Sequence, residues 1–285
     1  MAESALIFHV SDIHFGLEDK RALGWFEAEV ARRKPDAIAI TGDLTMRARH
    51  REFAAATRWI TALDAPVTVG VGNHDMPYFN LLERFADPYR RFRGMRELVE
   101  RELDLPGIAI VPLKTAARAQ PRLNWSKGWV TAAALEQCLA AIDALPRGTT
   151  ALIAAHHPLR EVGTQGTALT RGGTKALEAL AQRPVAAVLS GHVHDAFDIT
   201  EQTSQGPVRM IGAGTLSQRT RSTPPSFNSL SWKEGQLSVE VCNLQQVATP
   251  DMMIDDVPAN ALPPRAPGEP VAPVRQVPPV DPPVH

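Results

Sequence analysis

The chain has 285 residues, of which 44% are hydrophobic and 21% charged, a balance typical of one or two globular domains with a sizeable core. The formal net charge is -1 and the pI is about 6.8, so the overall field gives no reason to expect a nucleic acid polymer or an anionic membrane as a partner. An anionic substrate would have to be attracted locally.

Cysteine usage and hydropathy narrow the class of protein further. Cys138 and Cys242 lie apart from any metal-ligand pattern, which argues against a disulfide framework and against a thiolate metal site. No apolar run approaches the roughly 18 residues of a membrane helix, and no signal-peptide pattern precedes the first predicted strand. We therefore expect a cytoplasmic protein without a membrane span, and the oligomeric state stays open.

The N-terminal part alternates short apolar runs with amphipathic stretches. The pattern predicts strands at residues 6–10, 37–40 and 67–71, separated by helices at 17–34 and 52–63. Strands that read as continuous apolar runs are typical of parallel sheets, because these are buried on both faces. This half of the chain therefore predicts parallel βαβ units.

Residues 76–104 differ, because they are rich in arginine and aromatic residues. Two interpretations fit: an amphipathic helical insertion with a solvated basic face, or a cap over a site that helps to recognise a substrate. We treat residues 76–129 as a helical or irregular cap-like insertion. Within and after it, the pattern predicts strands at 108–113, 151–155 and 185–189, helices at 131–145 and 174–182, and a flexible loop at 163–173.

The C-terminal part changes character. Residues 208–212, 227–232 and 237–241 are expected to form antiparallel strands, the last two joined by a hairpin turn. Ten of the 28 residues from 258 to 285 are proline, without apolar periodicity, so we expect a disordered or extended tail. The predicted domain spans residues 1–245.

Polar side chains follow five of the predicted strands at the point where each strand ends. Six of the nine histidines lie in these positions. Residues i and i+2 of an extended segment point to the same side, and the carboxyl ends of parallel strands meet at one edge of a sheet. The strand ends carry Asp12 and His14, then Asp43, then Asn73, His74 and Asp75, then His156 and His157, and finally His192 and His194.

These residue types predict a metal centre. Two carboxylates, one amide oxygen and four imidazoles are too many ligands for one transition metal and suit two ions that share a carboxylate. Nitrogen and oxygen donors favour Mn, Fe or Zn over Mg or Ca. Two divalent ions with two carboxylates leave about +2 of charge, which attracts a phosphate ester, and they can activate a bridging water as hydroxide without a protein nucleophile.

The same signatures, in this order, resemble the calcineurin-like metallophosphoesterases over residues 6–215. The pattern is Asp12-x-His14, Gly42-Asp43, Gly72-Asn73-His74-Asp75, His156-x-Pro158 and Gly191-His192-x-His194. The resemblance implies an α/β fold, a four-layer α/β/β/α sandwich of two mixed β-sheets flanked by helices. It also implies two divalent or trivalent transition-metal ions (Mn, Fe or Zn) as cofactors.

The resemblance also implies a role for each site residue. One metal would take Asp12, His14, Asp43 and His194, and the other Asp43, Asn73, His156 and His192, with Asp43 as the bridge. The catalytic residues would be His74, which stabilises the transition state or helps to protonate the leaving group, and Asp75, which orients His74 or fixes its tautomer. In the pattern His-x-Pro the first histidine is the ligand, which favours His156 over His157.

Other polar residues are expected to lie outside the site. His9 lies inside a strand and is interpreted as a hydrogen-bonded core residue, and His50 and His285 as surface residues. Arg219 and Arg221 could reach a substrate phosphate, since arginine suits bidentate contacts. We interpret both as surface residues and leave them out of the site.

The predicted function is hydrolysis of small phosphodiesters, such as cyclic nucleotides, by attack of metal-bound hydroxide. This branch follows from the resemblance to bacterial cyclic-nucleotide and glycerophosphodiester phosphodiesterases. Alternatives within enzymes are a phosphomonoesterase and a hydrolase of a nucleotide-sugar lipid pyrophosphate. A DNA nuclease fits less well with the neutral charge, and a metal-free scaffold protein is disfavoured because no ligand of the pattern is lost.

Overall fold

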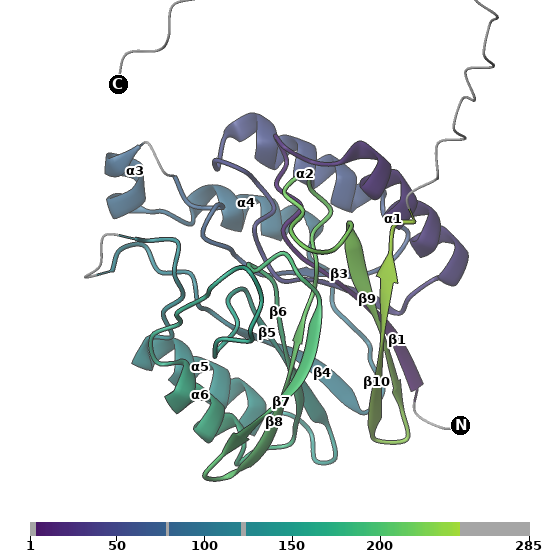
Figure 1. Cartoon of the computed structure of the whole chain (residues 1–285), viewed down its shortest axis with the longest axis vertical. Coiled ribbons are helices and arrows are strands. Elements are labelled where there is room, and N and C mark those ends of the chain that lie inside the picture. Colours follow the sequence, from purple (N-terminus) through teal and green to yellow (C-terminus); the bar gives the residue numbers. More distant parts are fainter. Residues whose placement is uncertain (1–3, 78–79, 121–123, 246–285) are drawn as a thin grey trace, which may run out of the picture. The chain divides into compact units, whose positions relative to one another are not determined.

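Two five-stranded sheets lie face to face (Figure 1). This computed structural model describes residues 4–77, 80–120 and 124–245, all of which belong to one compact unit. The predicted proline-rich tail at residues 258–285 lies outside the described residues.

The first sheet has the strand order β10-β9-β1-β2-β3. Its strands are β1 (Ser4–Val10), β2 (Ala37–Ile40), β3 (Val67–Val69), β9 (Ser226–Lys233) and β10 (Gln236–Asn243). The first three run parallel to one another, whereas β9 is antiparallel to both β1 and β10. The predicted hairpin is present, with Glu234 and Gly235 at positive φ in its two-residue turn.

The second sheet has the order β4-β5-β6-β8-β7. Its strands are β4 (Ile108–Leu113), β5 (Thr150–Ala155), β6 (Val185–Ser190), β7 (Phe197–Thr203) and β8 (Gly206–Gly212). All neighbours are parallel except β7 and β8. Strand β7 was not predicted, because as an edge strand with alternating half-exposed residues it has no continuous apolar run.

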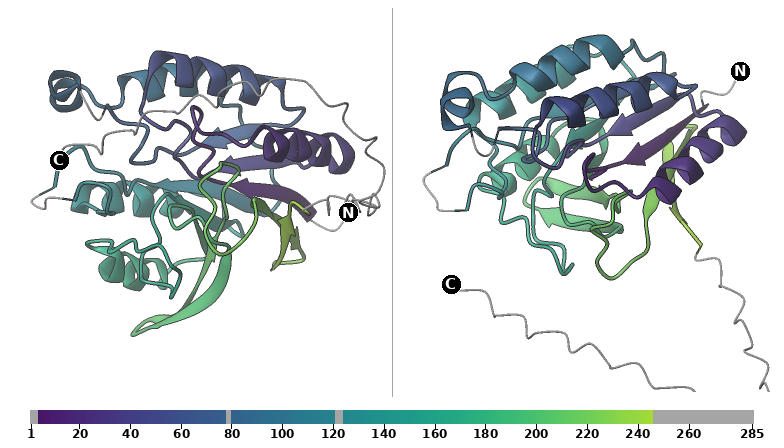
Figure 2. Two further views of the ribbon diagram at one scale, coloured as in Figure 1. Left: turned by 45° about the horizontal axis from the view of Figure 1, so that its top comes forward. Right: turned by 90° about the horizontal axis from the view of Figure 1, so that it is seen from above.

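Helices cover the outer face of each sheet. The chain forms α1 (Lys20–Arg33), α2 (His50–Ala62), α3 (Leu81–Ala86), α4 (Arg90–Val99), α5 (Ala132–Asp143) and α6 (Gly173–Leu180). Helices α1, α2 and α4 share a core with the first sheet, and α5 and α6 share one with the second, on opposite sides of the sheet pair (Figure 2).

The strands alternate between these cores. On β1, Phe8 and Val10 face the helices, whereas Ala5 and Ile7 pack with Leu152 and Leu189 of the other sheet. This third, inter-sheet core confirms the predicted four-layer α/β/β/α sandwich. No helix among the described residues has the length and apolar character that crossing a bilayer requires.

The range 76–129 is only partly separate from these layers. Helix α4 buries Phe92, Met95 and Val99 in the first core, and β4 forms an edge of the second sheet. Within residues 76–129, the short α3 and the segment around Trp125 lie outside the layers and approach the site described below.

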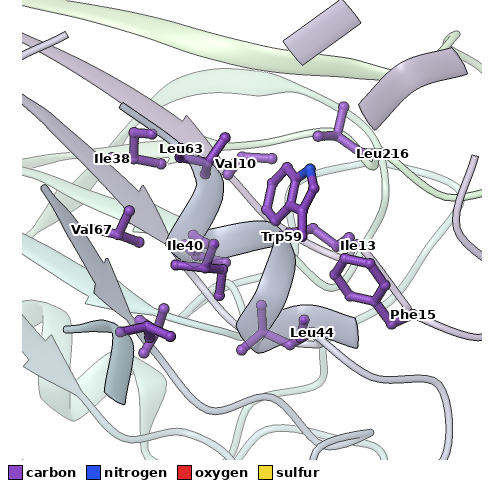
Figure 3. Close-up of a cluster of buried hydrophobic side chains, with 14 of the residues drawn as sticks. Val10, Ile13, Phe15, Ile38, Ile40, Leu44, Trp59, Leu63, Val67 and Leu216 are labelled. Atoms are coloured by element: carbon purple, nitrogen blue, oxygen red, sulfur yellow. The ribbon is translucent and has the colours of Figure 1, made fainter. Parts of the chain in front are cut away.

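The start of the first polar loop is anchored in the core. Ile13 and Phe15, which alternate with Asp12 and His14, are buried against Trp59 of α2 (Figure 3). The rings of Phe15 and Trp59 meet edge to face with centroids 5.9 Å apart. Burial of the apolar pair therefore holds the two polar residues at the end of β1.

Candidate functional site

The polar residues that follow β1, β2, β3, β5 and β6 converge at the carboxyl ends of both sheets. Their ligand-type atoms form overlapping groups, each within 4.8 Å. The groups are Asp12, His14 and His194; Asp12, Asp43 and His156; His14, Asp43 and His74; and His156, His157 and His192. The strand ends that the sequence singled out therefore meet in one place, although they come from two sheets.

The local backbone differs from the extended segments that the sequence suggested. Asp12, His14, Asp43, His192 and His194 all have positive φ, between 51° and 68°. Left-handed backbone is uncommon for residues other than glycine, and such strain is found mainly at functional sites. The buried Ile13 and Val193 stand between the polar residues of each pair. In each pair, two residues with left-handed backbone thus flank one residue without it, and this alternation, rather than a regular strand, points both polar side chains toward the site.

Asp12 and Asp43 hold the centre of the cluster. His194 Nε2 lies 3.1 Å and His14 Nε2 3.6 Å from Asp12 Oδ1. His156 Nε2 lies 3.3 Å from Asp43 Oδ2 and 3.1 Å from Asn73 Oδ1. The second oxygen of each carboxylate accepts a backbone N–H: Asp12 Oδ2 from His192 at 2.7 Å, and Asp43 Oδ1 from His74 at 2.8 Å.

Backbone carbonyls define the tautomers of three histidines. His156 Nδ1 contacts Thr41 O at 2.9 Å, His194 Nδ1 contacts Arg219 O at 2.6 Å, and His74 Nδ1 contacts Met46 O at 2.8 Å. A carbonyl can only accept, so each Nδ1 must donate its N–H, and in the neutral ring Nε2 keeps a lone pair. Metal-binding histidines are commonly oriented in this way, by a hydrogen bond from the other ring nitrogen to a carbonyl.

Several potential ligand atoms lie close to one another inside the protein. His14 Nε2 and His194 Nε2 are 3.2 Å apart, and Asp12 Oδ1 is buried with no hydrogen-bond partner. A buried acceptor such as Asp12 Oδ1 is costly to leave without a donor unless a cation or a proton lies beside it. Nitrogen and oxygen donors gathered in this way fit a transition-metal ion, which is the kind of cofactor the sequence predicts.

The electrostatics of the cluster agree with a site built for positive charge. Burial by itself would raise the pKa of Asp43, but the nearby histidines, His156 above all, hold it well below its usual range. Burial would lower the pKa of His156, but the charge of Asp43 and its hydrogen bond raise that pKa to about 9. The buried Asp43 carboxylate therefore favours positive charge beside it.

His157 has contacts unlike those of its neighbour His156. Thr115 Oγ1, which accepts the backbone N–H of His157, lies 2.9 Å from His157 Nδ1, and His157 Nε2 lies 2.9 Å from Ser126 O. Because Ser126 O can only accept, Nε2 carries the proton and Nδ1 accepts from Thr115. Both ring nitrogens are thus occupied, and the ring joins the end of β5 to the Ser126 segment.

Asp75 does not have the contacts that its expected role requires. Its carboxylate accepts N–H groups from Thr45 at 2.9 Å and Gly72 at 2.9 Å, and the Thr45 hydroxyl at 3.0 Å. The His74 ring is instead oriented by Met46 O. Asp75 therefore joins the loops after β2 and β3, and the Met46 carbonyl fixes the tautomer of His74.

Arg219 was interpreted as a surface residue, but it lies in the site. Its Nη1 is 3.3 Å from His74 Nε2 and 3.4 Å from His14 Nε2, and its carbonyl holds His194. Arg219 follows β8 by a loop of irregular structure, so no strand-end pattern marked it. By contrast, His9 is a core residue as expected, with Nε2 3.1 Å from Thr41 Oγ1.

A polar cavity of about 280 Å³ opens onto the cluster. Three basic side chains, Lys127, Arg219 and Arg221, line it together with Asp43, Asn73, His74, His192 and His194. The Lys127 ammonium is held at 2.6 Å by Thr167 O and Oγ1. In a chain with a net charge of -1, these side chains supply local positive charge that can attract an anion.

Two relatives are similar in sequence. A Synechococcus sp. protein named a probable cyclic nucleotide phosphodiesterase is 28% identical over 206 residues, which cover 67% of this chain and 74% of that protein. The glycerophosphodiester phosphodiesterase GpdQ of Enterobacter lignolyticus is 28% identical over 81 residues, 25% of this chain. The second match spans only 29% of that relative's length.

Solved structures share the fold at low identity. A dimetal phosphatase from Danio rerio superposes with a TM-score of 0.58 at 13% identity, covering 85% of this chain and 99% of that one. A purple acid phosphatase from yellow lupin seeds gives a TM-score of 0.59 at 15% identity, covering 85% and 52%. The family model for calcineurin-like phosphoesterases matches residues 5–196. The chain therefore belongs to the calcineurin-like phosphoesterase family, a family of phosphoester hydrolases.

Proposed function

We propose that this protein is a dinuclear-metal phosphodiesterase that hydrolyses small phosphodiesters such as cyclic nucleotides. The observation that carries the proposal is the convergence of buried histidine Nε2 atoms and carboxylate oxygens at the floor of a cavity lined by basic residues. The names of the two sequence relatives support the choice of a diester. We further propose that the two ions are manganese, iron or zinc.

The residues that would hold the metals are those predicted from the sequence. One ion would bind Asp12, His14, Asp43 and His194, and the other Asp43, Asn73, His156 and His192. His157 is not included, because its Nε2 donates to Ser126 O and its Nδ1 accepts from Thr115, and neither partner is a proposed ligand. Ions bound in this way supply Lewis-acid polarisation of the phosphate and activation of water.

The remaining side chains of the cavity would act on the substrate directly. Arg219 and Lys127 provide cationic donors for the phosphate oxygens. His74 presents Nε2 to the cavity while Met46 O holds Nδ1, so it can carry a proton to the departing oxygen. Asp75 supports this geometry through the loops rather than through the His74 ring.

The test is hydrolysis of bis(p-nitrophenyl) phosphate and p-nitrophenyl phosphate by protein that is stripped of metal and resupplied with Mn, Fe, Zn or Mg. We expect activity to return with a transition metal and kcat/KM to be higher for the diester. A preference for the monoester would instead identify a phosphomonoesterase. No activity at verified occupancy by two metals would favour a narrower substrate or a binding role.

A further inference from the structure

A second cavity adjoins the polar one. Its volume is about 240 Å³, and Asn73, His74 and Ser126 line both cavities. The other lining residues differ sharply in character: Met46, Met76 and Trp125 give it apolar walls, and Arg47 and Arg84 stand at its sides. Pockets that enclose a whole ligand usually measure about 300 to 1,000 Å³, so this cavity suits one part of a substrate.

Trp125 is held firmly in place although it lies on a loop. The guanidinium carbon of Arg84 lies 5.0 Å from the indole centroid, and the Phe85 ring meets the indole at 88° with centroids 5.9 Å apart. Arg84 is itself only 2% exposed, and it donates to Arg118 O at 2.8 Å and to Pro77 O at 3.2 Å. A buried, hydrogen-bonded arginine thus fixes the aromatic wall.

The same wall is tied to the metal-type cluster. Ser126, the residue after Trp125, accepts the Nε2–H of His157 through its carbonyl. Met46, another residue of the cavity wall, accepts the Nδ1–H of His74 through its carbonyl. The apolar walls are therefore fixed relative to the histidines at the ends of β3 and β5, which is a requirement for a preorganised binding site.

We propose that this second cavity is the subsite for a flat aromatic or heteroaromatic ester group, which packs on Trp125 and against Met46 and Met76. Aromatic rings and thioether sulfurs make favourable contacts with such groups. A polyhydroxylated alkyl group would instead lose hydrogen bonds to water on these walls. This inference rests on the proposed function, and it places the ring on the side of the phosphate where His74 lies.

The experiment compares two phosphonates that share the anion and differ only in the organic group. Phenylphosphonate and methylphosphonate are titrated calorimetrically into manganese-loaded wild-type protein and into the Trp125→Ala variant. We expect wild type to bind phenylphosphonate about 10-fold more tightly. In Trp125→Ala this preference should fall below about threefold through weaker phenylphosphonate binding, with methylphosphonate affinity unchanged within about twofold.

Two further variants separate stacking from loop damage. Trp125→Phe keeps an aromatic wall and should retain most of the preference. Leu82→Ala alters an 87% exposed residue of α3 outside the cavity and should behave as wild type. Equal binding of both phosphonates by wild type, or an unchanged preference in Trp125→Ala, overturns the subsite alone. If neither phosphonate binds, the proposed function fails and the subsite with it.

Discussion

Proton positions on the histidine rings decide which atoms of the cluster can reach a metal. Three rings give their Nδ1–H to carbonyls of residues far away in the sequence, and His157 instead gives its Nε2–H to Ser126 O. The consequence is a difference in role between His156 and His157, which have the same side chain and adjacent positions.

Replacement of the shared carboxylate should remove the metals. Asp43 lies in two of the ligand groups, so Asp43→Ala is expected to lose bound metal and with it nearly all hydrolysis of bis(p-nitrophenyl) phosphate. Metal content and kcat are measured on the same preparations. Asp64→Ala, at an exposed position before β3 that belongs to none of the ligand groups, serves as the control. Full activity and metal content in Asp43→Ala would refute the dinuclear proposal.

His74 should matter for turnover but not for metal content. In His74→Asn the proton carrier at the cavity wall is lost, whereas none of the proposed metal ligands is changed. We expect wild-type metal content and a kcat for the diester that is lower by about 10² to 10⁴, the usual contribution of general acid–base catalysis. Wild-type turnover would show that His74 has no part in proton transfer.

His157 should matter for stability but not for metal content. His157→Phe removes two hydrogen bonds of a buried ring and leaves Ser126 O without its donor, so the free energy of unfolding should fall by about 1–3 kcal/mol. Urea unfolding measures this loss, and metal analysis should give the wild-type value. His156→Ala is the matched comparison and should lose metal. The reverse pattern would exchange the roles of the two histidines.

Close approach between loops explains how strands of two sheets form one site. A Cβ atom on Gly191 would lie 1.9 Å from Ser11 Oγ and 2.4 Å from Asp12 Oδ2, so only glycine lets the end of β6 meet the end of β1. The loops after β2 and β3 meet in the same way at Gly72. Each element contributes ligands only because its neighbour's backbone can come this near.

Gly72→Ala should therefore act like the loss of a ligand. The added Cβ would lie 2.1 Å from Asp43 Oδ1 and 2.3 Å from Asp43 N, which forces the carboxylate or its backbone to move. We expect reduced metal content and a loss of about 1–3 kcal/mol of stability from overpacking. Gly70→Ala is the matched control, since its Cβ would have no neighbour nearer than 3.4 Å. Equal metal content in both variants would contradict this account.

At the scale of the whole molecule, one buried residue links stability to pH. Burial lowers the pKa of His9 from its usual value of 6.5 to about 3, so the folded protein keeps the ring neutral while the unfolded chain binds a proton below about 6.5. As pH falls from 6.5 towards 3, the unfolded state is favoured. For each unit by which the pH falls in this range, His9 therefore lowers the free energy of unfolding by at most about 1.4 kcal/mol.

The check is a comparison of slopes. Urea unfolding of metal-free wild type and His9→Gln between pH 6.5 and pH 4 should give a shallower pH dependence for the variant, by about 1 kcal/mol per pH unit. Titration of the cluster histidines is common to both proteins and cancels in the difference. Identical slopes would mean that His9 takes up a proton in the folded state.

Much of the fold followed from local patterns. The continuous apolar runs of β1, β2, β5 and β6 and the amphipathic spacing of α1 and α2 are periodicities of short segments, and those elements were predicted within a few residues. The half-exposed β7 was missed because its pairing with β8, rather than its own composition, makes it a strand. Residues 76–129 were grouped as an insertion because a linear pattern does not show that α4 and β4 join the core layers.

The sequence by itself determined which residue types gather at the site, because a strand end is a local feature and parallel strands bring their ends together. Only the tertiary structure decided how those residues act. Arg219 reaches His14 from 205 positions away, the Thr41 carbonyl sets the tautomer of His156, and Trp125 receives its support from Arg84. Such contacts depend on loops packing at van der Waals distance across two sheets, and neither residue spacing nor propensity carries that information.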